Sequence, residues 1–71
     1  MVRGALLETL EQADSPRTIE DVVNETLGRL GSSQFDPTAV RQVLDAFMES
    51  GWVTRYKDDS RYIQARHLVD G

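Results

Sequence analysis

The 71 residues of this chain include eight Lys and Arg against twelve Asp and Glu, giving a net charge of −4 at pH 7. A chain of this length forms one small domain, residues 1–71, and its acidic balance argues against indiscriminate affinity for nucleic acid because the field of the whole molecule repels phosphate. The sequence has neither an apolar run long enough to cross a membrane nor the apolar core of a signal peptide, so we expect a soluble, cytoplasmic protein with no membrane partner.

Two amphipathic segments open the chain, and each is predicted to be a helix. Asp14-Ser15-Pro16 ends the first segment, which runs from about residue 2 to residue 13. Thr18 can cap the second segment, with Asp21 three residues on in a weaker version of the capping box. Gly31-Ser32-Ser33 is expected to close this second helix after Leu30, with Gly31 as its C-terminal cap. The two apolar stripes are formed by Leu6, Leu7, Leu10 and Ala13, and by Ile19, Val22, Val23, Leu27 and Leu30.

A third helix is predicted over residues 37–49, and its start is the best marked in the chain. Asp36 can accept a hydrogen bond from a free amide of the first turn, and Pro37 fits the first helical position because it has no N–H to leave unpaired. Gly51 stands where a left-handed turn would end the helix. One face carries Val40, Val43, Leu44 and Phe47, and the opposite face carries Thr38, Arg41, Gln42, Asp45 and Glu49.

A short hairpin is predicted after Gly51. Residues 52–57 and 61–65 are rich in aromatic and β-branched side chains, and we expect a loop of three or four residues around Asp58-Asp59-Ser60. The tail, residues 66–71, is expected to be frayed or partly ordered. The hairpin region is locally basic, whereas the first 33 residues are mainly acidic.

The segments Phe35–Leu44, Glu49–Val53 and Arg61–Tyr62 carry a recognisable order: a capped Thr-Ala-Val-Arg-Gln-Val-Leu helix, then Glu-Ser-Gly-Trp-Val, then Arg-Tyr on a returning strand. This order resembles the winged helix-turn-helix superfamily, nearest to the DNA-binding half of ferric-uptake-regulator-type repressors. Their third helix reads Ala-Thr-Val-Tyr-Arg-Thr-Leu, and Glu-Ala-Gly-Leu-Val follows it. The resemblance covers roughly residues 6–64. It implies an α+β fold, a small winged helix-turn-helix of three helices followed by a two-stranded antiparallel wing.

The resemblance also implies that the chain binds double-stranded DNA as a transcriptional regulator. In the family a tyrosine and an arginine of the third helix face DNA, and here Arg41 and Gln42 take those positions. Because the first turns approach base edges most closely, Thr38, Arg41 and Gln42 are the predicted base contacts, with Arg41 suited to guanine and Gln42 to adenine. The predicted backbone contacts of the wing are Arg55, Lys57, Arg61 and Arg66. The family's metal-sensing and dimerisation domain is absent, so a response to metal is not carried over.

Other interpretations of these residues stay open. A polar helical face is often only a solvated surface, and charged residues commonly protect exposed strand edges. Trp52, Tyr56 and Tyr62 suit hairpin packing better than base stacking. The carboxylates of Asp45 and Glu49, together with the acidic net charge, favour the alternative of a winged-helix protein-interaction module without DNA binding.

Catalysis and cofactor binding are not expected. The sequence has no glycine-rich phosphate loop and no nucleophile with an identifiable base, and so small a domain offers little concavity for a substrate. With no cysteine and only His67 as an imidazole, a metal site is not expected either. A homodimer would offset the small core, through the Leu-rich stripe of the first helix or through the tail.

Overall fold

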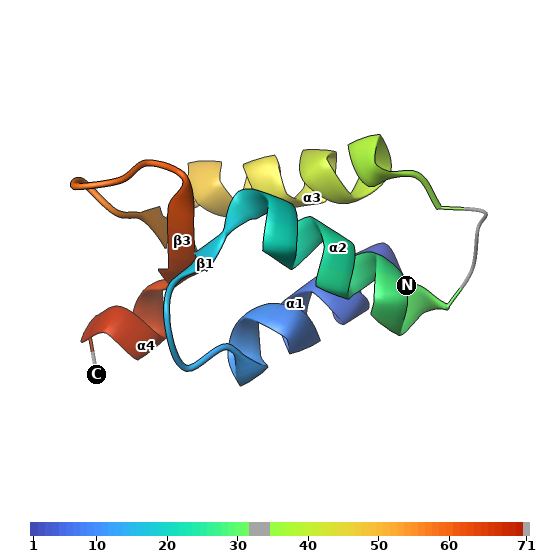
Figure 1. The fold of residues 1–71 in the computed structure, drawn as a ribbon, viewed down its shortest axis with the longest axis horizontal. Coiled ribbons are helices and arrows are strands. Elements are labelled where there is room, and N and C mark those ends of the chain that lie inside the picture. The colour runs from blue at the N-terminus through green and yellow to red at the C-terminus, as the bar shows by residue number, and fades with distance from the viewer. Residues whose placement is uncertain (32–34, 71) are drawn as a thin grey trace.

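Three helices pack around one apolar core, and a small antiparallel sheet closes one end of it (Figure 1). The structure is a computed structural model that describes residues 1–31 and 35–70. Its elements in chain order are α1 (Val2–Gln12), β1 (Arg17–Thr18), α2 (Ile19–Leu30), α3 (Pro37–Glu49), β2 (Val53–Arg55), β3 (Tyr62–Ala65) and α4 (Arg66–Asp70). The predicted α+β class is confirmed, and the order of elements is consistent with the predicted winged-helix arrangement.

The predicted helix starts and stops are set by local hydrogen bonds. The Thr18 hydroxyl accepts from the Asp21 amide at 3.1 Å, and the Asp36 carboxylate accepts from the Ala39 amide at 2.9 Å. Gly31 ends α2 in the left-handed region, with φ of 62° and its N–H donating to the Leu27 carbonyl. These three caps confirm the predicted boundaries of α2 and the start of α3. The Ser32 and Ser33 of the predicted terminator lie outside the described residues.

Gly51 turns the chain from α3 into the sheet. Its φ is 85°, a conformation that L side chains rarely adopt, and it directly follows Ser50, the C-cap of α3. The next amide, that of Trp52, donates back to the Phe47 carbonyl at 3.1 Å. The reversal predicted from the sequence is therefore present, and β2 starts two residues later at Val53.

The sheet has three strands rather than the two predicted, in the order β1-β3-β2, with antiparallel pairing throughout. The added strand β1 pairs Arg17 with Ile63 and Thr18 with Tyr62. A strand of two residues is too short to show alternation, and its partners lie more than 40 residues away. Sequence periodicity therefore could not reveal it.

The hairpin loop is longer than predicted. The last hydrogen bond of the hairpin runs from the Tyr56 amide to the Tyr62 carbonyl at 3.0 Å, so residues 57–61 form the loop instead of the expected three or four residues. Asp59 explains the difference, because its side chain accepts from the Arg61 amide and its carbonyl accepts from the Tyr62 amide. This local turn draws residue 61 out of the returning strand, which starts at Tyr62.

The tail is also more ordered than predicted, since residues 66–70 form the short helix α4. The Arg66 amide donates to the Trp52 carbonyl at 2.9 Å, which joins the start of α4 to the residue before β2. The His67 imidazole lies 3.1 Å from the Glu11 carboxylate of α1 and 5.6 Å, centroid to centroid, from the Trp52 ring. These contacts join the tail to residues far away in the sequence, which no local pattern could indicate.

The core is formed by the facing apolar sides of the three long helices and by the inner face of the sheet. Its fully buried aliphatic members come from α1, α2, α3 and β3, and include Leu6, Leu10, Val22, Val40, Leu44 and Ile63. Buried polar groups between α1 and α2 are satisfied within the protein: the Thr26 hydroxyl donates to the Val22 carbonyl at 2.7 Å, and Arg29 Nε donates to the Thr9 hydroxyl at 3.0 Å. Val40 and Leu44 are among the fully buried residues, so the predicted apolar face of α3 packs inward.

Truncating the centre of this core should destabilise the whole domain. Leu44 has no exposed surface, so Leu44→Ala should lower the free energy of unfolding by about 2–5 kcal/mol through lost apolar contact and a residual cavity. Urea denaturation followed by circular dichroism measures the change. Leu68→Ala on α4, where the side chain is 36% exposed, is the control and should change stability by less than about 1 kcal/mol. An equal loss in both variants would contradict the assignment of Leu44 to the core.

Candidate functional site

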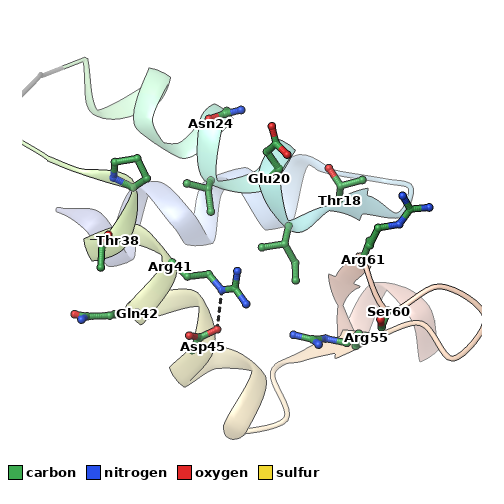
Figure 2. Close-up of a pocket in the computed structure, with 13 residues that line it drawn as sticks. Thr18, Glu20, Asn24, Thr38, Arg41, Gln42, Asp45, Arg55, Ser60 and Arg61 are labelled. Carbon is green, nitrogen blue, oxygen red and sulfur yellow. Dashed lines mark hydrogen bonds and ion pairs between the residues drawn. The ribbon is translucent and has the colours of Figure 1, made fainter.

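A groove of about 880 Å³ runs between the start of α2, the polar face of α3 and the hairpin (Figure 2). Its apolar surface comes from Ile19, Val23 and Pro37. The charged and polar side chains around it are Glu20, Asn24, Thr38, Arg41, Gln42, Asp45, Arg55, Ser60 and Arg61, with Thr18 at the start of α2. The groove thus has apolar surface bordered by charged groups from separate elements.

The three residues predicted to read bases lie together on one wall of this groove. Thr38, Arg41 and Gln42 are all exposed on the first half of α3, and all three line the groove. Their exposure follows from the opposite face of α3, since Val40 and Leu44 are fully buried against the other helices. These side chains are therefore at the surface because of the way α3 packs on the core.

The Arg41 side chain is held by Asp45, one helical turn further along α3. Arg41 Nε donates to Asp45 Oδ1 at 2.9 Å, and about half of each side chain is exposed. In the part of the chain that the structure describes, the Arg41 guanidinium makes no other hydrogen bond or ion pair. Figure 2 shows Arg41 extending from α3 toward the middle of the groove, with its terminal nitrogens beyond the bond to Asp45.

The four cations assigned to the wing do not form one patch. Arg55 and Arg61 border the groove, and Lys57 is exposed in the loop between the strands. Arg66 is not a wing residue, because it begins α4. It lies with Gly51 and Thr54 in a second, smaller depression, which Arg55 also borders. The sequence analysis grouped it with the wing because it belongs to the basic stretch that follows Trp52, although it directly follows the predicted strand.

Asp59 neutralises one of the groove arginines. Arg61 donates from Nε to Oδ1 at 3.0 Å and from Nη2 to Oδ2 at 2.8 Å, which is the bidentate geometry of a strong arginine–carboxylate pair. These hydrogen bonds from Arg61 lower the pKa of Asp59 from 3.8 to about 2, and the same pair raises the pKa of the Arg61 guanidinium. Arg55, the third groove arginine, contacts a neutral atom instead: its Nη2 donates to the Met48 sulfur at 3.5 Å.

The α2 residues that border the groove were not predicted. Glu20 and Asn24 are four residues apart and both exposed, so their pattern marks an outer face of α2. Which neighbour that face meets depends on how α2 and α3 cross, and periodicity does not encode the crossing. Ser60 was assigned only to a turn, and the longer loop brings it to the edge of the groove.

Two further observations concern metal binding and helix length in residues 1–31 and 35–70. They contain no group of three or more His, Asp or Glu side chains placed to hold a metal ion. None of their helices has the length and apolar character needed to span a bilayer.

Comparison with known proteins identifies no relative, since no family model, no curated protein and no solved structure matches the chain. The resemblance to winged helix-turn-helix proteins therefore depends on the residues of α3 and the hairpin and on the arrangement of the elements.

The Asp59–Arg61 pair can be tested by titration. Because the pKa of Asp59 is lowered to about 2, the pair stabilises the fold above the ordinary pKa of 3.8, and its contribution disappears as the pH falls through about 2. Carboxyl chemical shifts measured by NMR should give a midpoint near 2 for Asp59, and Arg61→Ala should return this midpoint toward 3.8. An unshifted midpoint in the unmodified protein would show that the pair does not persist in solution.

Proposed function

We propose that this chain is a winged-helix DNA-binding protein of the cytoplasm, a transcriptional regulator or an accessory factor. The observation that carries the proposal is the placement of Arg41, Arg55 and Arg61 around one groove beside the exposed face of α3, in a chain with a net charge of −4. Arginines from three separate elements meet at the surface where the elements of a winged helix meet DNA.

In the proposed complex, α3 enters the major groove, which is wide enough to admit a helix. Thr38, Arg41 and Gln42 lie in the first half of α3 and face outward, as base-reading residues of a recognition helix do. Arg41 suits the O6 and N7 atoms of guanine, and Gln42 suits the N6 and N7 atoms of adenine. The preceding helix, α2, then crosses the DNA backbone with its first turn beside the groove.

The wing supplies fewer free charges than its sequence suggested. Arg61 is paired with Asp59, so Arg55 and Lys57 are the proposed phosphate contacts of the hairpin. Each phosphate contact contributes about 0.9 to the slope of log affinity against log salt. We therefore expect a shallow salt dependence, consistent with a protein that selects its site by base contacts and has little general affinity for DNA. A homodimer, which would read two half-sites, is part of the proposal because one small domain makes few contacts.

A second function is favoured by a different observation. The groove has apolar surface from Ile19, Val23 and Pro37 and carries the carboxylates of Glu20 and Asp45, and phosphate would be repelled by those carboxylates. Such a groove also suits a protein segment that inserts an apolar side chain and pairs its own charges with those of the rim. In that case the chain is a protein-interaction module without DNA binding.

The two functions are separated by titrating the protein into mixed-sequence duplex DNA and following fluorescence polarisation. At roughly 50 mM and roughly 200 mM salt, DNA binding should weaken with salt, and unlabelled duplexes of different sequence should compete unequally. The absence of binding up to about 100 µM protein at the lower salt concentration would refute the DNA proposal and favour the interaction module.

Replacing Arg41 should affect one base position. On a preferred duplex, Arg41→Ala should cost about 1–3 kcal/mol of binding free energy and should relax the preference at that position, because a bidentate contact to guanine is lost. Lys57→Ala is the matched control, since it should weaken binding about equally on all sequences and reduce the salt slope by about 0.9. An equal loss on every sequence for Arg41→Ala would remove its role as a reading residue.

A further inference from the structure

Two arginine–aspartate pairs border the groove, and they differ in what they leave free. In the Arg61–Asp59 pair, the carboxylate accepts from both Nε and Nη2 of the guanidinium. Because Nη2 belongs to both two-donor edges of the group, neither edge is fully available to a base. In the Arg41–Asp45 pair, the carboxylate takes only Nε. The two pairs therefore have the same charge but a different availability of donors.

The bond to Asp45 fixes the direction of the Arg41 donors. A free arginine side chain samples many rotamers, and binding a base would restrict it to few of them. With Nε held at 2.9 Å from Asp45 Oδ1, part of this ordering is already present before any ligand arrives. The remaining donors of the guanidinium, Nη1 and Nη2, form the end-on fork that extends into the groove (Figure 2).

The Asp45 carboxylate also restricts what the site can accept. A negative charge on the wall of the groove repels phosphate oxygens and the acceptor atoms of base edges, unless a donor stands between them. Guanine offers its O6 and N7 acceptors to Arg41, which stands in that position. At any other base pair the fork of Arg41 lacks two matched acceptors, and the carboxylate faces the DNA without compensation.

We infer that Asp45 is a positioning residue that orients Arg41 for guanine and disfavours DNA without guanine at that position. This inference rests on the proposed DNA-binding function and names the base that the site selects. Asp45 would then contribute to sequence specificity. Without this role, the carboxylate of Asp45 would only weaken DNA binding by repelling phosphate.

The test uses the full chain and a randomised duplex library, from which the unmodified protein selects preferred duplexes. Duplexes carrying single base changes then identify the position at which Arg41→Ala loses discrimination. At that position, Asp45→Ala should reduce the preference for guanine over adenine by about tenfold, because the side chain of Arg41 is no longer held. Asp45→Asn keeps an acceptor for Nε without the charge, so it should restore part of the preference.

Glu49→Ala is the matched control. It removes an exposed carboxylate from the same helix, eight residues and about 12 Å along the axis from Arg41, and should leave the preference for guanine unchanged. Circular dichroism of each variant should show the melting transition of a folded domain, because both carboxylates are exposed.

The possible outcomes distinguish failure of the proposed role of Asp45 from failure of the proposed DNA binding. If the unmodified protein binds none of the duplexes, both the proposed function and the inference are wrong. If it binds and selects guanine while Asp45→Ala selects guanine equally well, only the inference is wrong. A uniform loss on all sequences in Asp45→Ala, or a similar loss of preference in Glu49→Ala, would also overturn it, because the effect would then be structural or due to net charge alone.

Discussion

The burial of one face of α3 is the constraint on which the rest of the structure depends. Val40 and Leu44 have no exposed surface, and Phe47 is 7% exposed, so the rotation of α3 about its own axis is fixed by the core. A helix with a fixed rotation must present its remaining face to solvent. The positions of Thr38, Arg41, Gln42 and Asp45 beside the groove follow from this packing.

The features that could be predicted from the sequence are those with local causes. Thr18 and Asp36 cap helices through amides three residues away, and Gly51 turns the chain through its own φ angle. The same locality allowed the exposed residues of α3 to be named from helical spacing. The additional features of the structure, namely β1, α4 and the contribution of α2 to the groove, depend on contacts between distant segments, such as Arg17 with Ile63 and Glu11 with His67.

Local ion pairs describe the charges of this protein better than its net charge does. The net charge of −4 includes carboxylates that are already engaged, as Asp59 is with Arg61 and Asp45 is with Arg41. Composition alone could indicate a locally basic hairpin but could not show which of its cations is neutralised within the chain. The geometry of each pair, monodentate or bidentate, decides which donors remain for a partner.

Thr18 belongs to two elements at once, and this has a mechanical consequence. It pairs with Tyr62 as the last residue of β1 and caps α2 through its hydroxyl, while the next amide, that of Ile19, donates to the Arg61 carbonyl at 3.0 Å. The start of α2 and the returning strand of the hairpin are thereby connected through adjacent hydrogen bonds. A wider groove would therefore require α3 to change its position relative to both of these segments together.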